Sequence, residues 1–249
     1  MFPLKDNLRC LTFPLVTVIL IALNCGAFIW ETIQLSSGSG DAMLKWMLVP
    51  SSIMSAFSSG DPYLIKWAVI SLFSHAFLHG GLMHLVGNMV FLFVFGKAVE
   101  ARLGWAKYIG FYLLGGLCAA AAQIGADPTT SVPMLGASGA IAGVLGGYLL
   151  LWPKADVTGF VPPMFIVRIR AYWFLLAWFI MQFLPIIQSG GDLSGAGVAY
   201  WAHIGGFIGG VLLGGLARLI QPVSDVCYIP SDCPPCEDKV DEDWDKPQK

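Results

Sequence analysis

Six long apolar runs, each close to the length at which a helix crosses a bilayer, constrain this chain more than any other feature. Charged residues make up only 12% of its 249 residues, against roughly 25% in ordinary soluble domains, and they cluster between the runs. Lipid offers backbone polar groups no water to bond with, so such runs are expected to be helical. The sequence therefore predicts an all-α membrane protein, a six-transmembrane helical bundle with spans at about 11–35, 82–101, 105–124, 135–152, 171–188 and 198–219.

Lysine and arginine predict how this bundle is oriented, because positive residues concentrate in cytoplasmic loops. Placing the N-terminus in the cytoplasm puts twelve of the fourteen lysines and arginines inside and only Lys45 and Lys66 outside. We therefore expect an N-in, C-in topology. The expected location is the cell (inner) membrane of a prokaryote. The net charge of −2 shows no basic excess, so no nucleic-acid partner is expected.

The sequence predicts one large membrane domain followed by a short tail. Residues 1–220 form the expected membrane domain, and within it the external segment 36–81 is apolar enough to lie partly at the membrane interface. The first run follows two basic residues, like a signal peptide, but it is longer than usual and lacks a small-residue cleavage site, so we expect it to be retained. Residues 221–249 are acidic and proline-rich and predict a flexible cytoplasmic tail, in which Cys233 and Cys236 have no assigned role.

Four polar side chains stand inside these apolar spans, where polar groups are costly and mark candidate functional sites. They are His84 and Asn88 in the second span, Ser138 in the fourth and His203 in the sixth. Counted from the cytoplasmic charge that ends each span, the four lie 14 to 18 residues along it, or about 21–27 Å at the rise of an α-helix. We therefore expect them at one depth, a little below the external surface of the membrane.

Glycines predict that the fourth and sixth spans pack closely. Small residues four apart let helix backbones approach inside a membrane. The two ridges are Gly139, Gly143 and Gly147, and Gly206, Gly210 and Gly214. This approach should bring Ser138 within hydrogen-bonding reach of His203, as a nucleophile beside its general base.

His84 and Asn88 are four residues apart and share one helix face. Together with the backbone N–H of Ser138, they could stabilise the oxyanion that forms when a hydroxyl attacks an amide. No Asp or Glu lies in the interior of the second, fourth or sixth span, which favours a Ser-His dyad over a triad. Histidines at this level could instead hold a metal ion, but without an acidic ligand beside them we expect neither metal nor cofactor.

These residues together resemble the rhomboid family of intramembrane serine proteases. The resemblance covers about residues 74–218 and rests on three motifs in order, on the second, fourth and sixth spans. They are the run from His79-Gly80 through His84 to Asn88, then Gly136-Ala137-Ser138-Gly139, then Ala202-His203-Ile204-Gly205-Gly206. Glu100-Ala101-Arg102 also resembles the Glu-x-Arg stretch of the family.

The resemblance implies a nucleophile at Ser138, a general base at His203 and oxyanion contacts from His84 and Asn88. It implies a serine endopeptidase whose partners are the lipid bilayer and single-span or polytopic membrane-protein substrates, cut near the external face. Many members carry an aromatic residue four positions after the nucleophile, packed on the histidine, where this chain has Ala142. Another side chain is therefore expected to support His203.

Two other classes of function stay open. A catalytically inactive rhomboid-like protein would bind or escort membrane proteins without cutting them, and the intact pair of Ser138 and His203 argues against it. A transporter would carry polar groups along a path through the membrane. The four polar residues gather instead at one expected depth, which favours proteolysis over transport.

Overall fold

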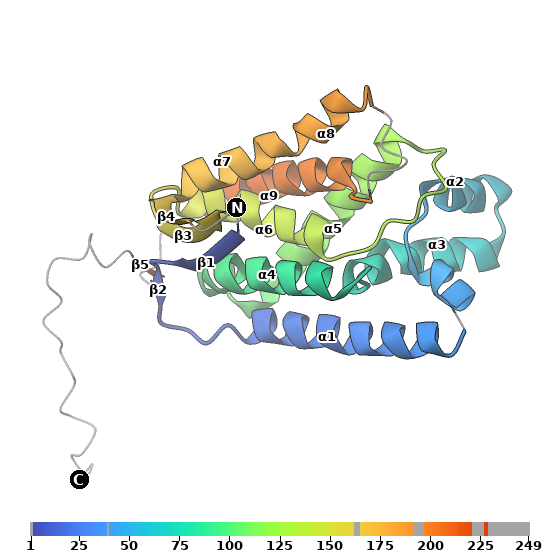
Figure 1. Ribbon diagram of the computed structural model, residues 1–249, viewed down its shortest axis with the longest axis horizontal. Coiled ribbons are helices and arrows are strands. Elements are labelled where there is room, and N and C mark those ends of the chain that lie inside the picture. Colours follow the sequence, from blue (N-terminus) through green and yellow to red (C-terminus); the bar gives the residue numbers. More distant parts are fainter. Residues whose placement is uncertain (1, 39, 162–164, 192–196, 221–226, 229–249) are drawn as a thin grey trace, which may run out of the picture.

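A computed structural model describes residues 2–38, 40–161, 165–191, 197–220 and 227–228 of the chain. Within them it contains five helical segments long and apolar enough to cross a membrane. These are α1 (Leu15–Ser36), α4 (Leu82–Leu103), α5 (Trp105–Ala126), the continuous segment of α7 (Ala171–Met181) and α8 (Phe183–Gln188), and α9 (Tyr200–Ile220). Figure 1 shows them side by side, with α1 along one edge of the bundle and α7 and α8 along the opposite edge. The expected helical membrane protein is confirmed at this level.

Helix α6 (Ser138–Leu151) occupies the fourth expected span and is shorter than the sequence predicts. Its 14 residues cover about 21 Å, less than the hydrocarbon thickness of about 30 Å. It begins late because Gly136 has φ +122°, a left-handed conformation that ends the extended chain just before Ser138. Residues 139–148 are all buried, so α6 lies in the core among longer helices. The count of six spans stays a prediction.

Helices α6 and α9 pack backbone to backbone, as the glycine ridges predict. A Cβ at Gly206 would overlap the carbonyl oxygen of Gly139, and one at Gly210 would overlap that of Gly143. Helix α5 packs against α6 as well, since a Cβ at Gly115 of α5 would lie 3.4 Å from Cα of Gly143. Helices α5, α6 and α9 therefore form a tight central cluster that fixes where α6 and α9 begin.

Helix α1 is joined to α4 by a buried carboxylate. Oε1 of Glu100 accepts from the backbone N–H of Val16 at 2.7 Å, and Oε2 accepts from the N–H and Oγ1 of Thr17 at 2.7 Å each. The first N–H groups of a helix have no partner within it, and α1 has no side-chain cap of its own. Glu100 supplies that cap from the neighbouring helix, and the same three donors give its two buried carboxylate oxygens their hydrogen bonds.

Short strands gather at one end of the bundle (Figure 1). β1 (Phe2–Asp6), β3 (Asp156–Val161) and β4 (Phe165–Arg170) form an antiparallel sheet in the order β1-β3-β4, and β2 (Arg9–Cys10) pairs with β5 (Cys227–Tyr228). The sequence predicts helices only, so the all-α description needs this correction. Alternating apolar and polar residues in the loop between α6 and α7 allow it to pair as a hairpin.

The sheet fixes the N-terminus to the bundle through Asp6, which ends β1. Oδ1 of Asp6 lies 2.7 Å from Nζ of Lys97, and its Oδ2 accepts from the hydroxyl of Tyr148 at 3.0 Å. Burial raises the pKa of this carboxyl, while Lys97 acts to lower it. The N-terminus and the α6–α7 loop therefore share one side of the membrane domain, as the expected topology requires. Which side is cytoplasmic stays a prediction.

The opposite end of the bundle carries the segment between α1 and α4 (Figure 1). It folds into η1 (Gly40–Trp46), α2 (Pro50–Ser59), α3 (Pro62–Ser74) and η2 (His75–Phe77). Its expected place at the membrane interface stays a prediction. Leu48 forms an isolated β-bridge with Met134, which ties the segment to the chain entering α6. Apart from β5, the expected tail at 221–249, with Cys233 and Cys236, lies outside the described residues, and the division at residue 220 stays a prediction.

Candidate active site

Ser138 and His203 meet at the end of the bundle away from the sheet. Ser138 is the first residue of α6, and His203 lies in the first turn of α9. Oγ of Ser138 and Nε2 of His203 are 2.8 Å apart, within hydrogen-bonding distance. The contact predicted from the two glycine ridges is therefore present, across 65 residues of sequence. The close approach of α6 and α9 at Gly139 and Gly206, directly after Ser138 and one turn after His203, sets this distance.

A third side chain, Gln182, contacts the other nitrogen of the imidazole. It lies between α7 and α8, and its Oε1 is 2.8 Å from Nδ1 of His203. Its Nε2 donates to the carbonyl oxygen of Trp178 at 2.8 Å. This residue is not among the site residues predicted from the sequence, although an amide in the interior of an apolar span was a signal that could have found it.

Trp178 also packs on the histidine, with ring centroids 5.7 Å apart and an interplanar angle of 37°. Tyr200 approaches His203 from the same helix, edge to face, at 6.4 Å. The sequence predicts that some side chain takes the place of the aromatic residue missing at Ala142. Trp178 and Gln182, both from the α7–α8 segment, fill that place.

His84 and Asn88 come from the first two turns of α4 and face the chain that leads into α6. A Cβ on Gly136 would lie 2.8 Å from Cε1 of His84 and 3.7 Å from Nδ2 of Asn88. Glycine is needed at position 136 both for this approach and for its positive φ. The two predicted oxyanion residues therefore lie beside Gly136, which precedes Ser138 by two positions.

Asn88 is held by His79, which precedes α4. Nδ2 of Asn88 donates to Nε2 of His79 at 2.9 Å, and the His79 and His84 rings meet edge to face at 5.1 Å. Burial lowers the pKa of His79 to about 4, with a smaller contribution from His84. His79 is therefore neutral at pH 7 and able to accept this bond. An amide nitrogen carries two protons, so Asn88 keeps a second N–H for another acceptor.

A carboxylate from α1 fixes the backbone of His79. Both carboxylate oxygens of Glu31 accept from the His79 N–H, at 2.9 and 3.2 Å, and Glu31 is buried. His75 is buried as well, and its Nδ1 donates to the carbonyl oxygen of Ser71 at 2.8 Å. Its own carbonyl oxygen accepts from the N–H of Gly136 at 2.9 Å. Both histidines are thus held in place by buried hydrogen bonds around the chain that leads into α4 and α6.

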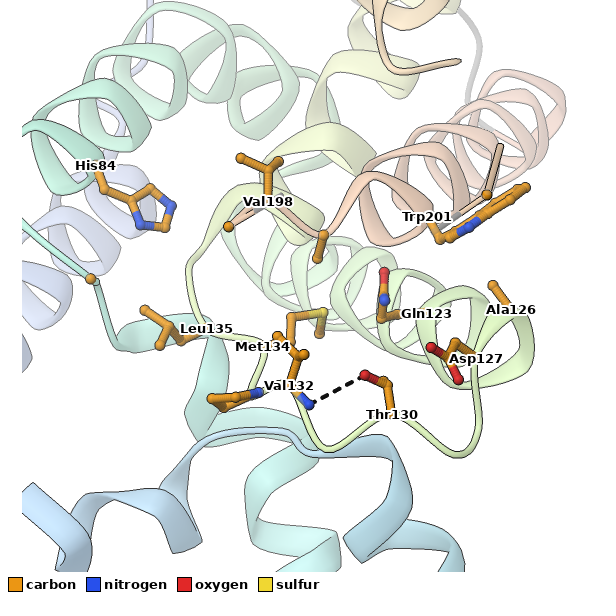
Figure 2. Close-up of a pocket in the computed structure, with 15 residues that line it drawn as sticks. His84, Gln123, Ala126, Asp127, Thr130, Val132, Met134, Leu135, Val198 and Trp201 are labelled. Atoms are coloured by element: carbon orange, nitrogen blue, oxygen red, sulfur yellow. Dashed lines mark hydrogen bonds between the residues drawn. The ribbon is translucent and has the colours of Figure 1, made fainter. Parts of the chain in front are cut away.

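A cavity of about 180 Å³ joins the four predicted residues. Ser138, His203, His84 and Asn88 all line it, with His75 and Gly136. A second cavity of about 290 Å³ shares His84, Met134 and Val198 with it and extends past Gln123 to Asp127. Figure 2 shows His84 and Val198 at one side of this second cavity and Gln123 and Asp127 at the other. The site therefore adjoins a groove that is polar at its far end.

This arrangement suits nucleophilic attack. A hydroxyl lies beside an imidazole nitrogen, at the N-terminus of α6, where unpaired N–H groups and the helix dipole favour negative charge. The remaining N–H of Asn88 and the His84 ring face the same cavity. Among the residues that the structure describes, no group of three or more His, Cys, Asp or Glu side chains could hold a metal ion.

The fold and site define the class of the protein: an integral membrane protein whose helical bundle buries a serine–histidine pair near one end. A Rhomboid domain is recognised across residues 66–219, more than half of the chain. The chain belongs to the rhomboid family.

Proteins of similar sequence are also named as rhomboids. Rhomboid protease GlpG of Salmonella choleraesuis (strain SC-B67) is 26% identical over 213 residues, which cover 85% of this chain and 66% of that protein. The proteins of the same name from Salmonella newport (strain SL254) and Salmonella enteritidis PT4 (strain P125109) give the same identity and coverage. The chain thus spans just under two thirds of the length of these curated relatives.

Proposed function

We propose that this protein is an intramembrane serine endopeptidase that cleaves transmembrane segments of other membrane proteins. The observation that carries the proposal is the 2.8 Å contact between Oγ of Ser138 and Nε2 of His203, at a cavity inside a helical membrane bundle. Membership of the rhomboid family and the similarity to proteins named rhomboid proteases support it.

In the proposed reaction, Nε2 of His203 takes the hydroxyl proton as Oγ of Ser138 attacks the carbonyl carbon of the scissile peptide. The carbonyl oxygen becomes an oxyanion, which the Ser138 N–H, the second N–H of Asn88 and the His84 ring stabilise. His203 then gives its proton to the leaving amine, which leaves an acyl ester on Ser138. A water molecule, activated by His203 in the same way, hydrolyses the ester and restores the hydroxyl.

The substrate needs a lateral route to this buried serine, and the α7–α8 segment is the proposed moving wall. Only 22% of this span is buried, the lowest share among the five long helical segments. Its outer face carries large apolar side chains such as Trp173 and Ile180, each more than half exposed. A wall with so little buried surface can be displaced more easily than α6, whose central residues are all buried.

The remaining parts of the proposal concern placement. We place the protein in the bacterial inner membrane, with six spans and an N-in, C-in topology. In that arrangement Ser138 would lie a little below the external face. Cleavage would then occur near that face. The membrane domain would end near residue 220, followed by a cytoplasmic tail.

A catalytically inactive rhomboid-like protein that binds or escorts membrane proteins is the second candidate. It would need the same groove but no proton transfer. The short contact between Ser138 and His203 favours the protease, because binding alone requires no hydroxyl placed on an imidazole.

The proposal is tested with the full chain in liposomes and a panel of single-span substrates that carry helix-breaking residues. We expect cleavage by the native chain and none by Ser138→Ala or His203→Ala. Ser36→Ala, which alters an exposed serine at the end of α1, is the matched control and should cleave normally. A serine-reactive fluorophosphonate should label the native chain and the control but not Ser138→Ala. Cleavage or labelling that persists in correctly inserted Ser138→Ala would refute Ser138 as the nucleophile and with it the proposed mechanism.

A further inference from the structure

Gln182 is a buried amide in an otherwise apolar span, with 8% of its surface exposed. It stands where α7 ends and α8 begins. Pro185 follows three residues later and has no N–H to continue the helical ladder of α7, which explains the break. An amide buried among apolar side chains is costly unless its polar atoms are bonded, and both polar atoms of Gln182 are.

The contacts of Gln182 decide which way its amide points. A backbone carbonyl can only accept, so the group facing the carbonyl of Trp178 must be the NH₂. The carbonyl oxygen of the amide therefore faces Nδ1 of His203, at 2.8 Å. An oxygen acceptor requires a donor opposite it, so the proton of the neutral imidazole resides on Nδ1.

This tautomer matters for the chemistry at the other side of the ring. With the proton on Nδ1, Nε2 carries a lone pair aimed at the hydroxyl of Ser138. With the proton on Nε2, the ring would donate to Oγ and could not accept its proton. The reactive tautomer is thus the one that Gln182 selects, through the carbonyl of Trp178.

We propose that Gln182 is a positioning residue that holds His203 in its reactive tautomer and orientation, through its contact with Nδ1. This rests on the proposed protease function. Because Gln182 belongs to the α7–α8 segment while His203 and Ser138 belong to α9 and α6, the dyad is complete only while that segment is packed against α9. Displacement of the segment leaves Nδ1 without its acceptor and lets the ring change tautomer. In the proposed lateral route, the displaced α7–α8 segment admits substrate, and its return to α9 restores His203 as the base.

Two substitutions separate this role from simple packing. Gln182→Met keeps the length and apolar volume of the side chain but removes the acceptor. Gln182→Glu keeps an oxygen acceptor, and as a neutral carboxyl it also keeps a donor for the Trp178 carbonyl. Gln188→Met alters an exposed glutamine at the end of α8 and is the matched control.

Cleavage kinetics and the rate of fluorophosphonate labelling are measured for all variants in liposomes. We expect Gln182→Met to lower kcat and the labelling rate by about 10- to 100-fold, with KM changed less than about twofold. Gln182→Glu should recover most of the loss, and Gln188→Met should match the native chain. The ¹⁵N NMR signals of His203, assigned by their loss in His203→Ala, should show a protonated Nδ1 in the native chain and a mixture of tautomers in Gln182→Met.

The outcomes distinguish a failure of the Gln182 role from a failure of the proposed protease function. Labelling and cleavage that survive in Ser138→Ala refute the proposed Ser138 mechanism. If that variant is inactive while Gln182→Met keeps its kcat and labelling rate, the protease stands and the role of Gln182 is wrong. A loss confined to KM, or no recovery in Gln182→Glu, would also overturn that role. Should Gln182→Met insert poorly, Gln182→Asn, too short to reach Nδ1, must show the same loss of kcat.

Discussion

Nδ2 of Asn88 donates to Nε2 of His79 at 2.9 Å, so a histidine outside the dyad orients the amide that faces the cavity. His79 is in turn fixed by Glu31, whose carboxylate accepts from its backbone N–H. A chain of contacts thus runs from α1, through the turn before α4, to the proposed oxyanion site.

Removing the imidazole of His79 should weaken catalysis without weakening substrate binding. We expect His79→Leu to lower kcat about tenfold, because an amide free to rotate stabilises an oxyanion less well than a fixed one. His79→Gln retains a side-chain oxygen that can accept from Asn88 and should lose less. Cleavage kinetics on one substrate measure both. Equal kcat for the two variants would show that the accepted bond does not matter.

Acid should destabilise the protein through His75 and His79. Burial lowers the pKa of His75 to about 4, and burial together with His84 lowers that of His79 to about 4, against an ordinary value of 6.5. Between pH 6.5 and 4 the unfolded chain binds protons that the folded chain does not. The free energy of unfolding should therefore decrease as the pH is lowered from 6.5 to 4, by up to about 1.4 kcal/mol per pH unit for each group. Unfolding in mixed detergent micelles at pH 7 and pH 5 measures the change.

His75→Gln isolates one of these two groups. Its amide can still donate to the carbonyl of Ser71 but does not titrate. The difference in stability between pH 7 and pH 5 should therefore be smaller in this variant than in the native chain. An unchanged difference would mean that His75 does not contribute.

The carboxylate of Glu100 should contribute more to stability than any single bond it makes. Glu100→Ala leaves two N–H groups and one hydroxyl without their charged acceptor, which we expect to cost about 3 kcal/mol or more. Thr17→Val removes only the hydroxyl and should cost about 1 kcal/mol. The same unfolding measurement compares them. Similar losses in the two variants would contradict the idea that Glu100 caps α1.

The backbone contact of α6 with α9 should tolerate no added methyl group. Gly210→Ala would place a Cβ on the carbonyl of Gly143 and should cost about 1–3 kcal/mol and most of the fluorophosphonate labelling. Gly110→Ala in α5 is the control, since its added Cβ would meet no side chain and no neighbouring helix within 4 Å. It should stay within about 1 kcal/mol of the native stability and label normally. Normal labelling in Gly210→Ala would show that Ser138 and His203 do not depend on this contact.

The sequence predicts the contact of Ser138 with His203 because two independent patterns agree. Apolar runs place both residues in spans, and glycines at four-residue spacing let those two spans approach. Helix bounds follow the same runs, and α4 and α5 begin where the sequence predicts. Such features depend on periodicity within a segment, which a single sequence displays.

Other features depend on contacts between distant segments and could not be predicted in the same way. Gln182 lies in a span whose hydrophobicity says nothing about which neighbour it faces. The late start of α6 depends on the φ of Gly136, within a run that reads as continuously apolar. The pairing of β1 with β3 joins residues more than 140 positions apart, and short strands carry too little periodicity to reveal partners.

The junction between β4 and α7 restrains the proposed wall at one end. Strand β4 ends at Arg170 and α7 begins at Ala171, whose N–H donates to the carbonyl of Ala155 at 2.7 Å. Ala171, Phe174 and Leu175 are buried, whereas no residue of α8 is. If the sheet stays intact, the α7–α8 segment would therefore rotate about Ala171. The largest arc would be swept by α8, and Gln182 would travel farther from His203 than any residue nearer the pivot.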